Sequence, residues 1–545
     1  MRRPTFSLGI LLGALISSPL VALFFLGEQL AALPFVPFDL FDWLARVLPG
    51  NVVTLGIDSI VGLVRLVGLG PTDRVAKGVE QAMAIGLVVV AGGVLGGLLA
   101  LAIGRTTRPG WQVGAGGGLL LALLVGGIEV SAGVLAKPVG GLLWIGLLLA
   151  GGGALLGHAL SPAAEPTLSP QDRAFRRALL AKMAVGSAGV VLGAWGLGRL
   201  LGSRPAPSGA GQPLPGGAAS VPPTPTPPLA AGSALPGASP QATLAVAPRD
   251  FIAPAPGTRP EVTPTEAFYR IDINARPVSI EGDSWVLQVD GLFDNPRPLT
   301  LADLMAYPPV TQAITLSCIS NPIGGDLIGT GYWTGVRLRD LLQDLGLRPE
   351  ARELYVEAAD GFYESVAMAD LMDPRTLLVY GMNGETLPVE HGYPLRIYIP
   401  NRYGMKQPKW ITRIEAIDRE GPGYWVDRGW SAEARPRIIS VIDTVAVDQQ
   451  VDGKVPIGGI AWAGDRGIQK VEVQVDGGPW VEAVLRTPPL SPLTWVQWRY
   501  DWPAVPGRHT FRVRATDGTG ALQIEERRPT RPDGATGYHE VTVTI

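Results

Sequence analysis

Cysteine and charged side chains are scarce in this chain. Its 545 residues include one cysteine, Cys318, and only 17% of them are charged. One thiol cannot form an internal disulfide, a zinc site of several cysteines or a cysteine-ligated iron–sulfur cluster. The low charge, a positive mean hydropathy and 71 glycines are unusual for one soluble domain, so we expect a membrane part joined to globular parts.

The apolar residues gather before residue 202. Five runs there approach the ~20 residues that span a bilayer core, at about 7–27, 80–103, 112–133, 139–160 and 179–201. A further stretch at 51–70 is interrupted by Asp58 and Arg65. We interpret this stretch as interfacial or re-entrant. The alternative is that it forms a sixth membrane span.

Positive charge favours five spans. With that number Arg3, Arg108 and the cluster at 173–182 all fall on one side, which is then cytoplasmic. The sequence therefore predicts a multi-pass protein of the cell membrane, in contact with lipid, whose later domains are extracytoplasmic. We expect the glycine-rich spans to anchor the chain rather than to transport, because no span carries a pair of ionisable residues.

An arginine pair precedes the fifth run, in the segment "FRRALLAK" at 175–182. It resembles a twin-arginine export signal in an internal position, and a topology anchor is the alternative interpretation. Residues 203–262 are rich in proline, alanine and glycine, with few charges, and predict a disordered, extended tether. We place the membrane domain at 1–202, this linker at 203–262, a globular domain at 263–435 and a β-sandwich at 436–545.

Cys318 lies between a strand-like segment and a glycine-rich loop. A buried cysteine that acts as a small hydrophobic residue is the ordinary interpretation. The polar, flexible neighbours favour a second one, in which a soft thiolate binds a transition metal.

The segment from about 265 to 431 resembles the molybdopterin-binding domain of the sulfite oxidase family. The similar features are Cys-x-x-Asn at 318–321, "WTGVRLRDLL" after it, and a block that holds "HGYPLR" at 391–396 and a later Lys-Trp. The resemblance implies a multi-domain protein, with an N-terminal α-helical membrane domain, an α+β molybdopterin domain and a C-terminal all-β immunoglobulin-like sandwich. It also implies a molybdenum–molybdopterin cofactor (Mo-pyranopterin).

The resemblance assigns the site residue by residue. Cys318 would be the metal ligand. The residues that would contact the cofactor, apart from Cys318, are Tyr269, Arg270, Asn321, Asp360, Ser365, His391, Arg396, Lys406 and Lys409, with Tyr363 nearby. The physical reasoning agrees, because a pterin phosphate requires cations and the ring requires fixed donors and acceptors.

Departures from the family concern the substrate. Sulfite-oxidising members follow Cys-x-x-Asn with arginine, whereas this chain has Pro322 and Ile323. The family's active-site tyrosine is either replaced by Trp430 or displaced to Tyr424, and we take Tyr424 and Arg428 as catalytic candidates beside Cys318. We therefore expect a small-molecule substrate other than sulfite, such as a sulfoxide. Arg402 or Arg428 could compensate for the missing arginine.

The segment after about 436 alternates in short β runs between turns, which predicts an antiparallel sandwich resembling the family's dimerisation domain, so a homodimer is possible. We expect an oxidoreductase that transfers an oxygen atom with two electrons. Its electron partner would be a cytochrome or a quinone-linked protein, and we expect no nucleic-acid partner. The alternative function is a cell-surface binding protein that kept the fold and lost catalysis.

Overall fold

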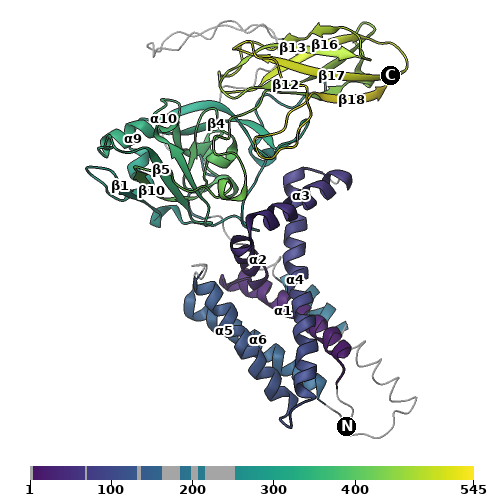
Figure 1. Ribbon diagram of the computed structural model, residues 1–545, viewed down its shortest axis with the longest axis vertical. Helices are drawn as coiled ribbons and strands as arrows, with labels where there is room; N and C mark the ends of the chain where they lie inside the picture. The colour runs from purple at the N-terminus through teal and green to yellow at the C-terminus, as the bar shows by residue number, and fades with distance from the viewer. Residues whose placement is uncertain (1–3, 68–69, 132–136, 162–184, 198–206, 215–251) are drawn as a thin grey trace, which may run out of the picture. The chain divides into compact units, whose positions relative to one another are not determined.

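The computed structural model describes residues 4–67, 70–131, 137–161, 185–197, 207–214 and 252–545 (Figure 1). The chain divides into two compact units. The first contains residues 1–70, 74–205 and 272–276, and the second contains 71–73, 206–271 and 277–545. Each unit is described separately.

The first unit is helical. Four of its helices are long and apolar enough to cross a membrane: α1 (Phe6–Ala31), α4 (Thr72–Ile103), α5 (Gly110–Ser131) and α6 (Pro138–Leu160). Between them in sequence lie α2 (Val36–Val47) and α3 (Gly50–Val67). Helix α3 covers most of the segment at 51–70, whose assignment as interfacial or re-entrant, with a sixth span as the alternative, stays a prediction.

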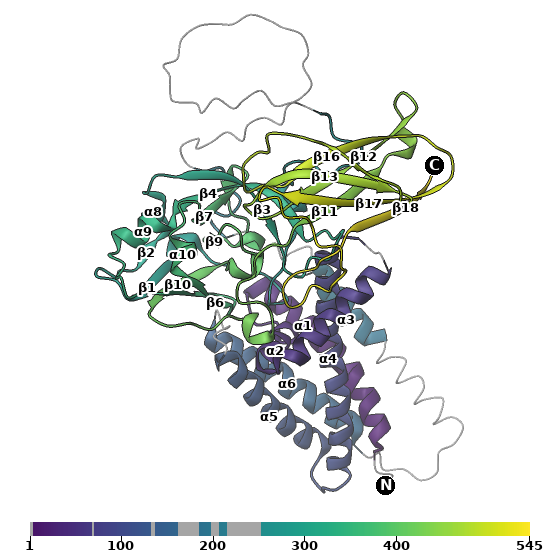
Figure 2. The same cartoon turned by 45° about the horizontal axis from the view of Figure 1, so that its top comes forward.

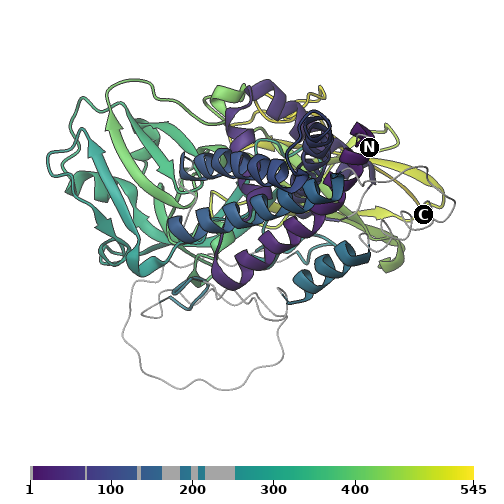
Figure 3. The same cartoon turned by 90° about the horizontal axis from the view of Figure 1, so that it is seen from below.

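Glycines bring these helices into close contact. A Cβ atom on Gly114 of α5 would overlap the backbone of Gly153 in α6, and one on Gly13 of α1 would overlap that of Gly92 in α4. Figure 3 shows α5 and α6 side by side. Small residues that allow backbones to approach are a common way to join helices in a membrane, as the sequence predicted for these spans.

The fifth predicted span and the tether fall partly outside the described residues. Of the run at 179–201, the described part forms an apolar helix at Val185–Leu197, and the rest of the predicted span lies outside the described residues. Two described parts of the tether expected at 203–262, residues 207–214 and 252–262, contain buried side chains. Leu214 is buried in the hydrophobic core of the second unit, and Ala255 is buried as well.

The amino-terminal part of the second unit contains two mixed α/β layers (Figure 2). The first sheet has the order β2-β1-β10-β5-β6, with strands at Leu299–Thr300, Val286–Gly291, Ile411–Ile417, Glu353–Ala358 and Tyr363–Ala367. The second has the order β3-β4-β7-β8, with β9 paired to β7, and its strands are Val310–Ser317, Ile328–Arg337, Leu377–Met382, Glu385–Thr386 and Arg396–Tyr398. Short helices α8 (Leu301–Met305), α9 (Leu338–Asp344) and α10 (Met368–Leu371) connect these strands.

Two antiparallel four-stranded sheets form the C-terminal part. One has the order β11-β12-β16-β15 (Ile439–Val445, Lys454–Trp462, Val496–Pro503, Val484–Leu485), and the other has the order β14-β13-β17-β18 (Trp480–Glu482, Ile468–Val475, Arg508–Asp517, His539–Thr544). Both sheets contribute apolar residues to one core, including Ile457, Trp498, Val471 and Phe511. The all-β sandwich is confirmed, and its immunoglobulin-like character stays a prediction.

A strap at 252–263 links the two parts of this unit. Its Arg259 guanidinium pairs with Asp443 on β11 at 2.6 Å, and the Gln497 side chain donates to the Arg259 carbonyl at 2.8 Å. The strap ends at Thr263, whose N–H donates to the Thr330 carbonyl on β4 at 2.7 Å. The end of the predicted tether is therefore built into the fold, because its backbone polar groups find partners there.

Candidate active site

Cys318 begins the connection between the paired strands β3 and β4. This segment, residues 318–327, is called the thiol loop below. The Cys318 N–H donates to the Leu327 carbonyl at 3.0 Å, and the Asn321 N–H donates to the Cys318 carbonyl at 3.1 Å. Asn321 also accepts from the Leu327 N–H through Oδ1, at 3.0 Å. Asn321 therefore shapes the turn that presents the thiol, so the Cys-x-x-Asn spacing has a structural reason.

The Cys318 side chain is buried and polar at its tip. It is 8% exposed, and its Sγ lies 3.0 Å from Ser320 Oγ. Burial raises the pKa of the thiol, against hydrogen bonds from Ser320 and Ile319 that lower it. The thiol therefore keeps its proton until a bound metal displaces it.

Four aromatic and cationic residues, called the pterin cluster below, meet beside β4 and β9. The Arg396 guanidinium lies 4.8 Å from the ring centre of Trp333 and donates to the His391 carbonyl at 3.1 Å. Phe268 contacts both Trp333 and His391, with ring centres 5.5 and 5.7 Å apart. The structure thus brings together the two residues of the "HGYPLR" segment that the resemblance assigns to the pterin.

Tyr269 connects this cluster with the thiol. Burial raises its pKa, and the nearby Cys318 and Arg396 act on it in opposite directions. Arg270 follows directly and is half-buried. The contribution of Arg270 to cofactor binding stays a prediction.

Gly392 sets the distance between two of the predicted cations. Its φ of 108° is in the region that favours glycine, and a Cβ atom there would lie 3.0 Å from the Cβ of Lys409 and 3.2 Å from that of Arg396. Lys409 Nζ donates to the Glu390 carbonyl at 3.0 Å and lies 4.4 Å from the Trp410 ring centre. A side chain at 392 would push these cations apart.

Lys406 forms a buried ion pair with Glu364. Its Nζ donates to Glu364 Oε1 at 2.7 Å and to the Ser365 carbonyl at 3.2 Å, and both side chains of the ion pair are buried. Burial raises the pKa of Glu364 to about 7, although Lys406 opposes the shift. Ser365 Oγ donates to the Pro422 carbonyl at 2.9 Å. Lys406 and Ser365 therefore hold the β6 region together, and their contact with a cofactor stays a prediction.

Asp360 shapes the turn before β6. Its Oδ1 accepts from the Phe362 N–H at 3.0 Å, and the residue is buried. Its predicted contact with the cofactor is not tested by this bond.

The two catalytic candidates downstream lie together. The Arg428 guanidinium stacks 3.7 Å from the ring centre of Tyr424 and donates to the Tyr424 carbonyl at 2.9 Å. Tyr424 also contacts the Tyr363 ring at 5.7 Å. Trp430, by contrast, packs in a buried cluster with Ile319, the neighbour of Cys318. The family's active-site tyrosine was expected to be either replaced by Trp430 or displaced to Tyr424. Of these two residues, Trp430 is the one whose described contacts reach the thiol loop.

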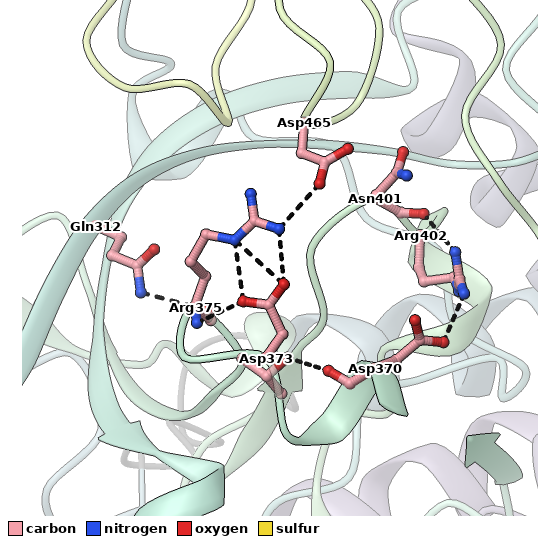
Figure 4. Close-up of polar contacts among 8 residues, drawn as sticks. Gln312, Asp370, Asp373, Arg375, Asn401, Arg402 and Asp465 are labelled. Atoms are coloured by element: carbon pink, nitrogen blue, oxygen red, sulfur yellow. Dashed lines mark hydrogen bonds and ion pairs between the residues drawn. The ribbon is translucent and has the colours of Figure 1, made fainter. Parts of the chain in front are cut away.

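Arg402 forms an ion pair with Asp370. Figure 4 shows its guanidinium bonded to Asp370 at 2.5 Å and to the Asn401 carbonyl at 3.0 Å. In the same view Arg375 forms ion pairs with Asp373 at 2.6 Å and with Asp465 at 2.9 Å. Asp465 belongs to the sandwich, so Arg375 joins the two parts of the second unit.

The sequence analysis missed three residues of this region. Glu364 is the buried partner of Lys406. Tyr403 has a pKa that burial raises to about 12, with Cys318 among the smaller influences. Arg531 of the sandwich lies 5.0 Å from the ring centre of Trp430. The alternation of β6 could have marked Glu364 as inward-facing, but no local signal links Tyr403 or Arg531 to the thiol.

Comparisons with known proteins agree with this geometry. Residues 274–425 match the family model described as the oxidoreductase molybdopterin binding domain. The chain is 32% identical to a sulfite oxidase of Arabidopsis thaliana over 41% of its own length and 70% of the relative's. It is 30% identical to the uncharacterized oxidoreductase YuiH of Bacillus subtilis over 32% of its own length and 87% of the relative's.

A third relative has a different name. The putative protein-methionine-sulfoxide reductase subunit YedZ1 of Azospira oryzae is 32% identical over 32% of this chain and 63% of its own. The fold, the site and these relatives define a molybdopterin-dependent oxidoreductase. The chain belongs to the sulfite oxidase family.

The residues present fit a molybdopterin cofactor. Trp333 Nε1 is buried beside Arg396 and has no hydrogen-bond partner among the described residues, so it is a donor that a ligand could satisfy. Among the same residues no group of three or more His, Cys, Asp and Glu side chains forms a metal cage. One soft thiol and a cluster of cationic and aromatic side chains, with Tyr269 near both, suit a metal whose other ligands come from the cofactor itself.

Proposed function

We propose that this chain is a membrane-attached oxidoreductase that moves an oxygen atom to or from a small uncharged substrate. The bound molybdenum cofactor would supply the two-electron oxygen-atom transfer. Cys318 would bind the metal after losing its proton, and Asn321 would hold the thiol loop in place. Arg396, His391 and Trp333 would orient the pterin.

The proposal of an uncharged substrate rests on the arginine that is missing from the thiol loop and on the contacts that occupy the arginines nearby. Pro322 and Ile323 stand where sulfite-oxidising relatives carry arginine. The two arginines that could replace it are engaged, since Arg402 pairs with Asp370 and Arg428 stacks on Tyr424. A lost charged hydrogen bond costs ~1.5–3 kcal/mol, which is about tenfold to more than a hundredfold in affinity.

The name of the Azospira oryzae relative points to a sulfoxide as the uncharged substrate. Reduction of a sulfoxide consumes two electrons and two protons and releases a thioether and water. Sulfite oxidation, named for the Arabidopsis thaliana relative, is the second candidate.

The test is a steady-state comparison on the purified full chain. Reduction of methionine sulfoxide with a reduced viologen and oxidation of sulfite with ferricyanide would be measured side by side. We expect kcat/KM for the sulfoxide to exceed that for sulfite by about tenfold or more. Pro322→Arg should raise the sulfite value, and Arg339→Ala, on the exposed face of α9, is the control. Efficient sulfite oxidation by the unaltered chain would refute the uncharged substrate.

The localisation is part of the same proposal. The arginine distribution supports a catalytic part outside the cytoplasm, where a cytochrome or a quinone-linked protein would exchange electrons with it. A reporter fused after residue 210 should lie on the extracytoplasmic side of the membrane, and one fused after residue 108 should lie in the cytoplasm. The reverse pattern would overturn the topology.

A further inference from the structure

A histidine of the C-terminal sandwich contacts the thiol loop. His539 is the first residue of β18, where it pairs with Val513 of β17. Its ring lies against Gly324, so closely that a Cβ atom on this glycine would overlap Nε2 and Cδ2. Gly324 has a φ of 76°, so it is a glycine for conformational and steric reasons together.

The opposite edge of the same ring is fixed to the sandwich. The Ile442 N–H on β11 donates to His539 Nδ1 at 3.0 Å. Because a backbone N–H can only donate, Nδ1 must be unprotonated, and the neutral ring carries its proton on Nε2. The imidazole therefore has one edge bound to β11 and the other edge against the thiol loop.

The thiol loop is thus restrained from two sides. Asn321 closes it from within, through Leu327 and the Cys318 carbonyl. His539 covers it from without, at Gly324. We infer that His539 is a positioning residue, which holds the thiol loop so that Cys318 is presented to the metal. This inference rests on the proposed role of Cys318, although the contact itself does not.

Three charged residues surround the histidine, and they come from different segments. Asp443 follows Ile442 on β11, Arg259 lies on the strap, and Arg527 lies before β18. Burial lowers the pKa of His539, Asp443 raises it, and both arginines lower it. Neutral His539 is therefore favoured in the folded state, and its contribution is present above the ordinary histidine pKa. That contribution is lost as the pH falls through the lowered value.

The single cysteine makes the loop measurable without any activity. Full-length protein from cells that cannot make molybdopterin would be labelled with N-ethylmaleimide, and the labelling rate reports how often the loop opens. In His539→Asn the shorter side chain can still accept from Ile442 but cannot reach Gly324. In His539→Gln the side chain reaches further and should restore the contact. His509→Asn is the matched control, since this histidine lies in the same sandwich and bonds to Asp476 at 2.6 Å.

We expect His539→Asn to raise the labelling rate by about tenfold, which corresponds to ~1.4 kcal/mol in the opening equilibrium. The His539→Gln and His509→Asn variants should stay near the unaltered rate. Hydrogen exchange should show less protection of the Gly325 and Leu327 amides in His539→Asn than in the unaltered protein. In the unaltered protein this protection should decrease as the pH falls below ~6.5, whereas in His539→Asn it should not depend on pH in this range.

Two results would overturn the inference. One is an unchanged labelling rate in His539→Asn while the Ile442 amide stays protected. The other is an equal increase in the His509 control, which would indicate general loosening of the sandwich. Failure of the proposed function would look different, because metal analysis of cofactor-competent cells would find no molybdenum while the labelling results stood.

Discussion

The pterin cluster and the thiol loop are two ends of one candidate site, and they are built differently. Three of the four cluster residues lie between 333 and 396: Trp333 is on β4, Arg396 is on β9, and His391 is in the turn before β9. The thiol loop is one short turn, but its contacts come from Trp430 and from His539 at the far end of the chain. The comparison teaches that most of the pterin cluster comes from one stretch of the chain, whereas the surroundings of Cys318 come from distant parts of the second unit.

The largest expected effect is at the thiol itself. Cys318→Ser should abolish turnover, because a hydroxyl is a poor soft ligand, while the pterin cluster still holds the pterin. Activity, molybdenum and pterin content would be measured in the same preparation. Ser320→Ala, which removes the Sγ neighbour but keeps the thiol, should retain molybdenum. Normal turnover in Cys318→Ser would show that Cys318 is not the metal ligand.

The buried Glu364–Lys406 pair belongs neither to the pterin cluster nor to the thiol loop. We expect its loss to lower the stability of the fold. Lys406→Met leaves a buried carboxylate unpaired, which costs ~3–5 kcal/mol of unfolding free energy. The Glu364 pKa is already raised by burial to about 7, and loss of the cation raises it further. Stability from protonated Glu364 is present at low pH and is lost as the pH rises through 7, so the destabilisation should be larger at pH 8 than at pH 5.

Urea unfolding of the full chain at the two pH values measures this effect. Lys470→Met is the control, on the exposed face of β13. Equal losses of stability at both pH values would show that Glu364 does not titrate as its burial indicates.

Arg396 tests the pterin cluster. Arg396→Ala removes the cation over Trp333 and should lower the bound pterin by about tenfold to a hundredfold, as expected for a lost charged hydrogen bond of ~1.5–3 kcal/mol. Fluorescence of the released pterin gives the content. Labelling of Cys318 in cofactor-free protein should not change. A faster labelling rate would show that the two ends are coupled.

The smallest effect is expected at Arg375, which joins Asp373 to Asp465 of the sandwich (Figure 4). The pair is partly exposed, and such pairs contribute ~0.2–1 kcal/mol. Arg375→Ala should therefore shift thermal unfolding slightly and leave activity unchanged. A large loss of activity would mean that alignment of the sandwich depends on this pair rather than on the strap.

The sequence predicted much of this molecule. Among the described residues, four of the predicted apolar runs coincide with helices long and apolar enough to span a membrane. The alternation after 436 predicted the sandwich, and the "HGYPLR" segment contains His391 and Arg396 of the pterin cluster. It failed where partners are distant in the chain. Leu214 and Ala255 look like tether residues by composition, yet each finds a buried place that only the tertiary structure provides. The ion pair of Lys406 with Glu364, 42 positions away, is not visible from the residues next to Lys406 in the sequence.

The solitary thiol has a consequence for assembly before the cofactor arrives. The chain has no second cysteine, so it cannot form a wrong internal disulfide before the cofactor binds. Burial and a raised pKa also keep Cys318 protonated and slow to react with peroxides or electrophiles. The empty protein is therefore chemically durable, and it becomes reactive only when it is loaded.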